Sequence, residues 1–385
     1  MILKTALHDR HLALHAKMTD FHGWDMPLYY TSILDEHKAV REQLGIFDIS
    51  HMGQVLVAGP DAEKTLNHLM VSDFHEVGLE RACYTMMLNE NGGIIDDLII
   101  YRLGQQEFLV VVNCGNHAVD VAWMKAHAQG NVTINDISEG RSILAVQGPK
   151  ASRVLEEILD AKVAGLGRFS IAPIRTMAPD ACIARTGYTG GDGFELFLPD
   201  KHARRVWDAV LTFAKPFGAL PIGLGARDTL RVEAGLRLHG SDMDDKTTPI
   251  EAGLDWTVAL NKPEFIGKEV LVRQKKEGVS RKLAGFEMAQ GPVPRGGIDL
   301  LIPTTPGEAP GRKIGTVTSG TYSPILNKPL GMGYVEPSFA KAGTAVSLIV
   351  RNQRYLGTVV KMPFWKGEQK QPALSSAAPT MERLT

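Results

Sequence analysis

The pattern of hydrophobic and polar positions points first to a hairpin between Tyr84 and Leu103. Two runs rich in β-forming residues flank the segment Asn89-Glu90-Asn91-Gly92-Gly93, whose Asn-Gly and Gly-Gly steps supply the positive-φ positions of a tight turn. The second run is apolar except for the adjacent acids Asp96 and Asp97 and a late arginine. This pattern predicts two antiparallel strands, the second of which carries two carboxyl groups into apolar surroundings.

The two acids should face opposite sides of the sheet, because side chains alternate along a strand. The side chains that share the face of Asp97 are Ile95, Ile99, Tyr101 and Leu103. A carboxylate among such neighbours is desolvated, which raises its pKa unless a donor or a cation meets it. Asp97 is therefore the first candidate functional residue. An equal alternative, on the strand alone, is an aspartate at the sheet rim that accepts a backbone hydrogen bond.

Up to about residue 280, helical spacing alternates with short β-rich runs, which indicates mixed helical and strand structure. Helices are predicted over residues 32–44, 62–70, 118–129, 151–159, 203–214 and 229–236, and further strands over 54–58, 107–113, 142–146, 182–186 and 194–198. Asp61 is the expected cap of the second helix. The order strand, Gly-Pro, helix occurs at residues 55–69 and again at 143–159, which resembles a weak internal duplication.

From about Arg281 the chain changes to short strands separated by Gly and Pro, which predicts a separate small β-barrel or sandwich. The predicted strands cover residues 283–288, 312–319, 331–335, 345–350 and 353–362. The last stretch, 366–385, is rich in Gln, Pro, Ser and Ala and is expected to be a disordered tail.

Composition and charge then narrow the class of protein. A chain of 385 residues suggests two or three domains, and its net charge of -1 gives no reason to expect a nucleic-acid partner. Three cysteines without metal spacing argue against both a disulfide framework and a metal site, and favour a reducing compartment. The N-terminus resembles no signal or transit peptide, and no run of about 18 apolar residues predicts a membrane span. The expected location is the cytoplasm, or a matrix-like space if a presequence has been removed.

The segment from Thr186 to Glu195 is a glycine-rich loop flanked by Tyr188 and Glu195. Its glycines permit close approach of backbone to a ligand, but on composition alone a generous β-hairpin loop is the favoured explanation. No lysine and no helix start follow, so a phosphate cradle is not indicated. Glu195 stands between apolar residues of the returning strand, where its carboxylate can accept paired donors from a flat heterocycle with an amino-amide edge, such as a pterin.

Four further positions are weaker candidates, and each has a structural alternative. Arg227 stands beside small residues, where its guanidinium could meet a carboxylate or ring carbonyl; a structural pair with Asp228 is the alternative. Asn113 follows an apolar strand and could bind a ligand or cap the next helix. Met52 is more simply explained by packing, and Trp256 by a core position, although Trp256 could also form an aromatic wall.

Taken together and in order, these segments resemble the glycine cleavage system T protein, or aminomethyltransferase, family. The motifs that carry the resemblance extend from about Leu7 to Phe364 and include Phe21-His22-Gly23-Trp24, Phe47-Asp48-Ile49-Ser50-His51-Met52-Gly53, Gly92-Gly93-Ile94-Ile95-Asp96-Asp97-Leu98, Val112-Asn113, Gln147-Gly148-Pro149, Thr186-Gly187-Tyr188-Thr189-Gly190, Gly223-Leu224-Gly225-Ala226-Arg227-Asp228, Leu230-Arg231-Val232-Glu233-Ala234-Gly235, and Thr318-Ser319-Gly320 with Ser323-Pro324.

The resemblance implies a three-domain cloverleaf around a central folate channel, with two discontinuous α+β domains and a C-terminal β-barrel-like domain. On this basis we expect residues 1–51 with 139–225 to form the first domain, and 52–138 with 226–280 to form the second, which carries the Asp97 hairpin. Residues 281–365 are then the barrel domain and 366–385 the tail.

The resemblance also implies an activity. Members of the family transfer the aminomethyl group carried on the lipoyl arm of the H protein to tetrahydrofolate, with release of ammonia and formation of 5,10-methylenetetrahydrofolate. Tetrahydrofolate is then a co-substrate, the lipoylated H protein a transient partner, and the protein a monomer without a metal.

Motif matching implies a role for each candidate residue. Asp97 takes the place of the family's catalytic acid, which orients and polarises a folate nitrogen and assists proton movement. The expected folate contacts are Tyr84, Asn113, Tyr188, Glu195 and Arg227, with Glu195 on the pterin edge. Met52 and Trp256 are carried over as walls of the channel.

The chain departs from the family pattern at two positions. Gly191 stands where a Glu is common, and His239 replaces a usual Tyr before Gly240. The alternative activity is a tetrahydrofolate-dependent demethylase acting on a small N- or S-methyl compound with the same folate site. A non-enzymatic folate-binding relative is disfavoured because its Lys-Gly-Cys-Tyr-x-Gly-Gln signature is absent.

Overall fold

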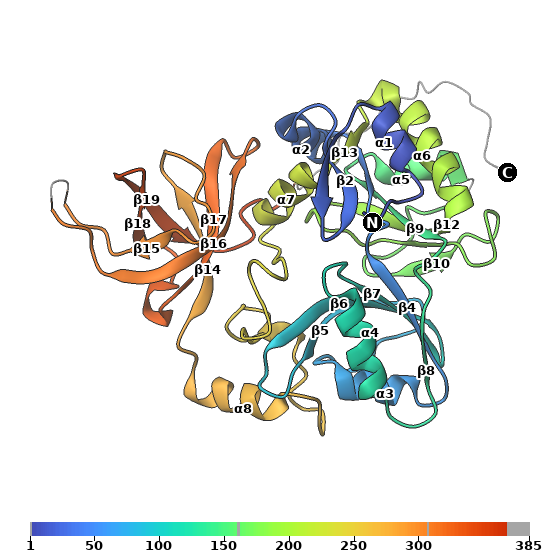
Figure 1. The fold of residues 1–385 in the computed structure, drawn as a ribbon, viewed down its shortest axis with the longest axis horizontal. Helices are drawn as coiled ribbons and strands as arrows, with labels where there is room; N and C mark the ends of the chain where they lie inside the picture. The colour runs from blue at the N-terminus through green and yellow to red at the C-terminus, as the bar shows by residue number, and fades with distance from the viewer. Residues whose placement is uncertain (1, 160–161, 306–307, 368–385) are drawn as a thin grey trace.

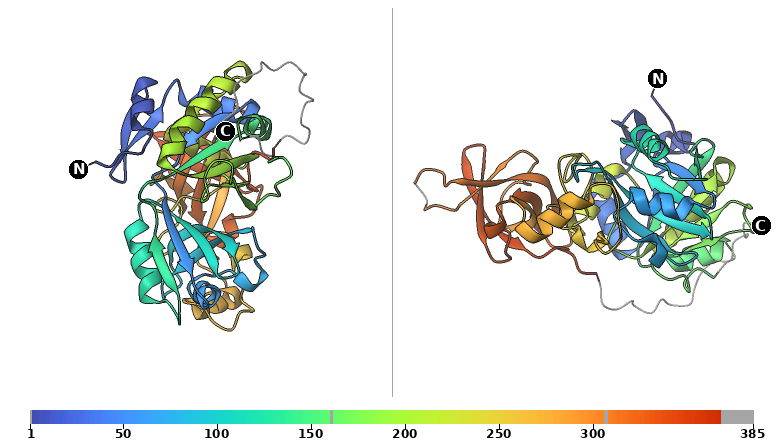
Figure 2. Two further views of the ribbon diagram at one scale, coloured as in Figure 1. Left: turned by 90° about the vertical axis from the view of Figure 1, so that its right-hand side faces the viewer. Right: turned by 90° about the horizontal axis from the view of Figure 1, so that it is seen from below.

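The computed structural model describes residues 2–159, 162–305 and 308–367, so most of the predicted tail lies outside the described residues. Figure 1 shows three lobes around a central segment: two α+β lobes, one above the other, and a β-barrel beside them. The barrel stands at one end of the long axis, as the right-hand view of Figure 2 shows. The α+β class and the C-terminal barrel are thus confirmed, whereas the proposed domain boundaries stay a prediction.

The upper lobe is built on a six-stranded sheet in the order β10-β11-β12-β9-β3-β13. These strands are β3 (Gly45–Asp48), β9 (Arg141–Gln147), β10 (Ile171–Pro173), β11 (Cys182–Ala184), β12 (Gly193–Pro199) and β13 (Leu220–Ile222). Helices α5 (Ala151–Leu159) and α6 (Asp200–Ala214) cover one face and bury a core that includes Trp207 and Phe194. α1 (His8–Ala13), the hairpin β1 (Lys17–Phe21) and β2 (Trp24–Tyr29), and α2 (Ile33–Glu42) complete the lobe.

The lower lobe contains a five-stranded sheet in the order β5-β6-β7-β4-β8. Its strands are β4 (Gly53–Ala58), β5 (Ala82–Leu88), β6 (Ile94–Gly104), β7 (Glu107–Val112) and β8 (Thr133–Asp136). Helices α3 (Ala62–Leu69) and α4 (His117–Ala126) bury Leu66, Phe108 and Met124 against one face. The predicted hairpin is confirmed, since β5 and β6 pair antiparallel around the turn, where Gly92 has a φ of 78°.

The expected cap of α3 is wrong. Asp61 occupies the N-cap position, but its side chain makes no capping hydrogen bond. Its carboxylate instead accepts from the backbone N–H of Asn131 at 2.7 Å. A tertiary partner across the lobe thus outcompetes the local one, which the sequence alone does not reveal.

The repeated order strand, Gly-Pro, helix adopts the same backbone conformation twice. Gly59 after β4 has a φ of 132° and Gly148 after β9 has a φ of 129°. A Cβ atom would lie 2.7 Å from the Asn131 carbonyl oxygen in the first case and 2.7 Å from the Gln43 carbonyl oxygen in the second. Both turns therefore require glycine, which supports the duplication.

Helix α7 (Leu224–Glu233) begins and ends earlier than the predicted helix 229–236. Its start is fixed by a tertiary contact, because the Gly223 N–H donates to a carboxylate oxygen of the buried Glu36 at 2.8 Å. As a result, Arg227 stands in the first turn of a helix and not in a loop.

The C-terminal lobe is a closed six-stranded barrel in the order β14-β17-β16-β15-β18-β19. Its strands are β14 (Lys282–Met288), β15 (Asp299–Leu301), β16 (Lys313–Ser323), β17 (Lys328–Val335), β18 (Ala345–Val350) and β19 (Gln353–Val360), and α8 (Lys268–Glu277) precedes them. β15 was not predicted, because three residues give too short a pattern. Within the described residues, no helix is long and apolar enough to cross a membrane.

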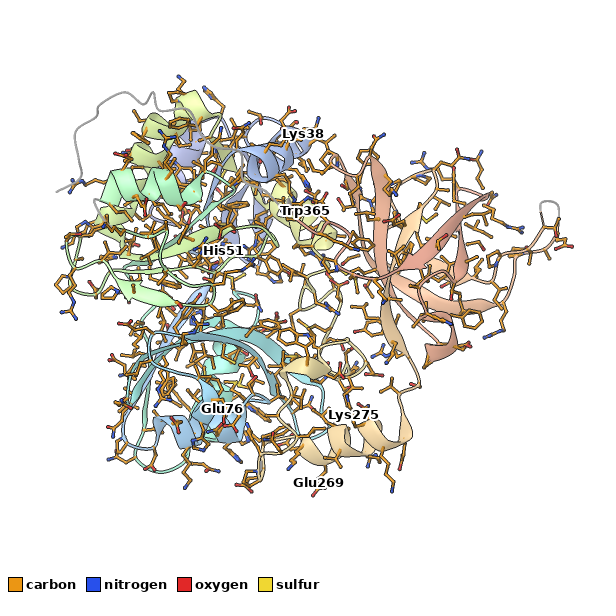
Figure 3. The ribbon with its side chains drawn as sticks, turned by 180° about the vertical axis from the view of Figure 1, so that it is seen from behind. Lys38, His51, Glu76, Glu269, Lys275 and Trp365 are labelled. Carbon is orange, nitrogen blue, oxygen red and sulfur yellow. The ribbon has the colours of Figure 1, made fainter. Side chains whose placement is uncertain are left out.

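A buried cluster joins the barrel to the upper lobe. Glu233 of α7 accepts from the guanidinium of Arg41 in α2 at 2.6 Å and from the hydroxyl of Ser323 in β16. The guanidinium of Arg41 lies over the ring of Trp365, 3.8 Å from its centroid. Figure 3 places Trp365 where the upper lobe meets the barrel, so this cluster fixes the two lobes against each other.

Candidate active site

A cavity of about 210 Å³ lies where the two sheets, the start of α7 and the segments around residues 236–239 and 254–256 meet. All eight residues that the sequence singled out line it, namely Met52, Tyr84, Asp97, Asn113, Tyr188, Glu195, Arg227 and Trp256. They come from segments far apart in the chain. The structure therefore brings together every candidate side chain, although the role of each stays a prediction.

Asp97 projects from β6 into this cavity and is only partly buried. Oδ2 accepts from the hydroxyl of Tyr84 at 2.9 Å, and Oδ1 accepts from the side-chain amide of Asn113 at 3.0 Å. Burial and the neighbouring Asp96 raise the pKa of Asp97 to about 7, against the opposing effects of Tyr84, His239 and Asn113. The rim alternative is wrong, because within the described residues the carboxylate accepts from the side chains of Tyr84 and Asn113 and not from a backbone amide, and because it faces a cavity.

The face prediction for β6 is confirmed from Asp97 onwards but is wrong for Ile95, which packs with Leu98 and Ile100 because a register shift between Met87 and Leu88 interrupts the alternation there. Asp97, Ile99 and Tyr101 all line the cavity, in keeping with the period of two along a strand. Asp96 points to the other side and is fully buried. It accepts from the backbone N–H of Asn113 at 3.0 Å and from the side-chain amides of Asn113 and Asn116 at 2.8 and 2.9 Å.

Asn113 bridges the two carboxylates from the end of β7. Its amide nitrogen lies 2.8 Å from Oδ1 of Asp96 and 3.0 Å from Oδ1 of Asp97. The alternative that Asn113 caps the next helix is wrong, because the residue at the N-cap of α4 is Asn116. Asn113 thus holds Asp97 in place and also reaches the cavity wall.

Glu195 sits in the middle of β12 and is 8% exposed. One of its carboxylate oxygens accepts from the hydroxyls of Thr186 and Tyr101, the latter at 3.2 Å. Burial raises the pKa of Glu195, while Thr186, Arg227 and Tyr101 oppose the rise. These contacts leave acceptor capacity on the carboxylate toward the cavity.

Arg227 reaches the cavity from the first turn of α7. Its guanidinium stacks over the ring of Tyr188, 4.7 Å from the centroid. The predicted alternative of a pair with Asp228 is wrong, since Asp228 pairs with Arg231 at 2.8 Å. Across the described ranges no hydrogen bond or ion pair of the Arg227 guanidinium is found, so its donors are available to a ligand. The Tyr188 hydroxyl donates to the Arg237 carbonyl oxygen.

Trp256 and Met52 both line the cavity, but Trp256 is exposed to solvent whereas Met52 packs in an apolar cluster. Trp256 is 71% exposed and stacks on Tyr84 with ring centroids 6.2 Å apart, so the core alternative is wrong. Met52 packs against the apolar cluster between the two sheets, which confirms the packing prediction. It also lines the cavity. Its neighbour His51 is buried edge-on against Phe21, and Figure 3 places it between the two lobes.

The sequence reasoning missed two polar residues of the wall. Tyr101 was assigned to the face of Asp97 only as an apolar neighbour, yet its hydroxyl contacts Glu195. His239, noted only as a departure, lies 2.9 Å from the Asn116 amide nitrogen through Nδ1 and 3.0 Å from the Ile94 carbonyl oxygen through Nε2. Only the period-two pattern of β6 could have indicated Tyr101, and no pattern indicated His239.

The glycine-rich loop is the connection of the antiparallel hairpin β11–β12, as its simpler explanation held. Even so, Gly187 and Tyr188 of this loop line the cavity. At Gly191, a Cβ atom would lie 3.8 Å from the ring of Trp365, so the indole occupies space beside the position of the family's glutamate. Among the described residues, no three His, Cys, Asp or Glu side chains gather as a metal site.

Comparison with known proteins agrees with this geometry. The family model described as the GCVT N-terminal domain matches residues 7–262, and the glycine cleavage T-protein C-terminal barrel domain matches residues 281–366. An aminomethyltransferase of Halothermothrix orenii is 42% identical over 361 residues, which cover 94% of this chain and 99% of that protein. An aminomethyltransferase of Desulforamulus reducens is 41% identical over 365 residues, which cover 95% of this chain and 98% of that protein. A crystal structure of glycine cleavage system aminomethyltransferase T from Bartonella henselae superposes with a TM-score of 0.88 at 34% identity, covering 95% of this chain and 99% of that one.

Proposed function

The chain belongs to the glycine cleavage T-protein family, and we propose that its cavity binds tetrahydrofolate with a reacting nitrogen against Asp97. The protein is an aminomethyltransferase of the glycine cleavage system. The observation that supports the proposed site is the convergence of eight side chains from distant segments on one cavity, among them the carboxyl group of Asp97, whose pKa is raised to about 7.

The reaction requires proton transfer and no change of oxidation state. Two C–N bonds form between the methylene carbon and nitrogens of tetrahydrofolate, while the C–S bond to the lipoyl arm and the C–N bond to ammonia break. Two protons leave the folate nitrogens, and two are taken up by the departing ammonia and thiolate. A group that accepts and returns protons near pH 7 therefore serves the reaction directly.

Asp97 is suited to that task. A carboxyl with a pKa of about 7 is a far stronger base than an ordinary aspartate, yet it is still ionised in half of the molecules at neutral pH. Tyr84 and Asn113 fix both of its oxygens and so orient the remaining lone pairs toward the cavity. We assign Asp97 the alignment of the attacking nitrogen and the acceptance of its proton.

Glu195 and Arg227 are assigned to the pterin ring. A buried carboxylate matches the two N–H donors of the amino-amide edge, and its burial strengthens the contact. The Arg227 guanidinium is held flat by Tyr188 and presents donors to a ring carbonyl. The stacked pair Tyr84 and Trp256 supplies an aromatic wall, and Met52 an apolar one.

The remaining assignments concern partner and location. We propose that the lipoylated H protein delivers the aminomethyl group as a transient partner of a monomer, because this follows from the family's reaction. We also propose a cytoplasmic location, which the free thiols of Cys83, Cys114 and Cys182 support.

The decisive experiment compares methyl and methylene donors on the same purified enzyme. Aminomethylated lipoyl-H protein and tetrahydrofolate should give 5,10-methylenetetrahydrofolate and ammonia in equal amounts. A small methylated amine or thioether should give no methyl transfer under the same conditions. Turnover of the small donor without turnover of the H-protein donor would overturn the proposal in favour of a demethylase.

A further inference from the structure

Behind Asp97 lies a third carboxyl group that the proposed reaction does not use. Asp120 of α4 is fully buried and does not line the cavity. The chain winds from Asn113 into α4 so that the Asn116 N–H bonds to the Asn113 carbonyl oxygen at 3.0 Å, and the Asp120 N–H to the Asn116 carbonyl oxygen at 2.8 Å. Asn113, Asn116 and Asp120 therefore project from one face toward β6.

The donors are distributed unequally between the two buried acids. Asp96 receives three N–H groups, two from Asn113 and one from Asn116. For Asp120, in contrast, no N–H or O–H group of the described residues donates to either carboxylate oxygen. Asp120 lies one helical turn beyond Asn116, whose side-chain amide donates to Asp96, so the carboxyl groups of the two buried acids face each other.

Two carboxylates in contact and withheld from water cannot both be ionised, so one proton must lie between them. Three N–H donors stabilise the charged form of Asp96, whereas nothing stabilises a charge on Asp120. The proton therefore resides on Asp120 and its O–H donates to Asp96. Consistently, burial and the charge of Asp96 raise the pKa of Asp120 to about 11.

We propose that Asp120 is a positioning residue, a carboxylic acid kept protonated so that its O–H fixes a negative charge on Asp96 beside the catalytic Asp97. The location of the proton on Asp120 does not depend on the proposed function. Its effect on the reaction rests on the proposed role of Asp97. The fixed charge of Asp96 makes Asp97 a stronger base, and the Asp120 O–H adds to the three N–H groups that hold this charge in place.

Other groups also face the three acids. They are Tyr84 from β5, Cys114 before α4, Tyr188 from the β11–β12 loop and His239. His239 donates through Nε2 to the Ile94 carbonyl oxygen and accepts through Nδ1 from Asn116, which describes the neutral ring.

Infrared spectroscopy of the full-length enzyme without substrate tests the location of the proton. At neutral pH the wild type should show a C=O stretching band of a protonated carboxylic acid that shifts in D2O and persists at pH 9. The variants are compared at pH 9, where Asp97 is ionised and gives no such band; there the band should be lost in Asp120→Asn and kept in Asp97→Asn. If Asp120→Asn retains the band, or the wild type has none at pH 9, the proposal fails whatever the role of Asp97.

The pH profile of turnover tests the consequence. Asp120→Asn keeps a neutral donor to Asp96 and should keep the acidic limb within about 0.3 pH units of wild type. Asp96→Asn removes the charge and should lower the midpoint by about one unit or more. Asp120→Leu removes one donor to Asp96 and leaves the three N–H groups, so it should lower the midpoint by less than Asp96→Asn but by more than Asp120→Asn. A shift in Asp120→Asn as large as that in Asp96→Asn would mean that Asp120 is charged, which would overturn the proposal. Should Asp120→Leu fail to fold, the infrared result and the Asp120→Asn profile still decide.

Discussion

The hydroxyl of Tyr84 donates to Oδ2 of Asp97 across two neighbouring strands, with 2.9 Å between the oxygens. Asp97 is paired directly with Met86, and Tyr84 with Ile99, so the contact is a diagonal one on the cavity face. The donor stabilises the charged carboxylate and lowers the pKa of Asp97, whereas burial and Asp96 raise it. The protonation of Asp97 is thus set by opposing neighbours on the two sides of one strand.

Tyr84→Phe should raise the pKa of Asp97 above about 7, because it removes a donor to the charged form while keeping the stack on Trp256. If ionised Asp97 is the base, the acidic limb of the kcat profile should move to higher pH by about one unit. Turnover at pH 9 should remain close to wild type. The measurement is a profile of kcat from pH 5 to pH 9 with saturating tetrahydrofolate, and a limb that moves to lower pH would contradict the assignment.

Asp97→Asn should keep the fold and folate binding but lose turnover by about 10²–10⁴-fold, the usual contribution of a positioned acid or base. The amide cannot take up the proton that the folate nitrogen sheds. Turnover should be measured beside the dissociation constant for tetrahydrofolate and the far-ultraviolet circular dichroism. A variant that is folded, binds folate and turns over within about threefold of wild type would remove Asp97 from the mechanism.

Asp97→Asn should also stabilise the folded protein, by an amount that depends on pH. The folded-state pKa of about 7 lies above the value of about 3.9 in an unfolded chain, so the folded state binds the proton more tightly. The free energy of unfolding of the wild type therefore falls as the pH rises from about 4 to about 7, and levels off above that. Asp97→Asn removes this loss, which is on the order of 4 kcal/mol at most. Thermal unfolding should show a gain at pH 8 that is clearly smaller at pH 5; an equal gain at both would contradict the raised pKa.

Glu195→Ala and Arg227→Ala should each raise the Michaelis constant for tetrahydrofolate by about 10- to 100-fold, with a smaller effect on kcat. Each removes a ring contact, and Glu195→Ala also leaves the hydroxyls of Thr186 and Tyr101 without their acceptor. Glu90→Ala, in the exposed hairpin turn, is the matched control and should change nothing. An unaltered Michaelis constant in both variants would exclude them from the pterin subsite.

Particular residues show which parts of the fold can be predicted from the sequence. The face of Asp97 followed from strand alternation, and the turn at Gly92 from its glycine steps, because both depend on local geometry alone. The cap at Asp61 and the start of α7 were predicted wrongly, since partners distant in the chain, Asn131 and Glu36, decide them. Local propensity is a weak guide where a buried tertiary hydrogen bond competes.

In the candidate site too, the sequence predicted which residues take part but not the contacts between them. Motif resemblance selected the eight lining residues, but it gave no account of what holds them. Asn113 was expected as a ligand or a cap, whereas its amide joins Asp96 to Asp97. Trp256 was expected in a core, whereas it stands exposed against Tyr84. Such relations depend on which strands become neighbours, and no periodicity within a segment encodes that.

The last prediction concerns Glu233, which joins the barrel to the upper lobe. Burial opposes its ionisation, but the hydrogen bond from His37 and the charge of Arg41 together hold the pKa of Glu233 below its usual range. Glu233→Ala would leave the buried Arg41 guanidinium without its counter-ion and should cost about 3–5 kcal/mol. Glu336→Ala breaks an exposed pair with Arg312 and is the control that should leave the denaturation midpoint unchanged.

The pH dependence of that loss tests its cause. A carboxyl whose pKa is lowered in the folded state contributes stability above its unfolded pKa, and this contribution is lost as the pH falls through the folded value. The difference between wild type and Glu233→Ala, measured by denaturant unfolding, should therefore shrink below about pH 4. If the difference stayed constant down to the lowest pH at which the wild type is folded, the loss would come from packing and not from the charge of Glu233. The ion pair with Arg41 would then not be what fixes the barrel against the upper lobe.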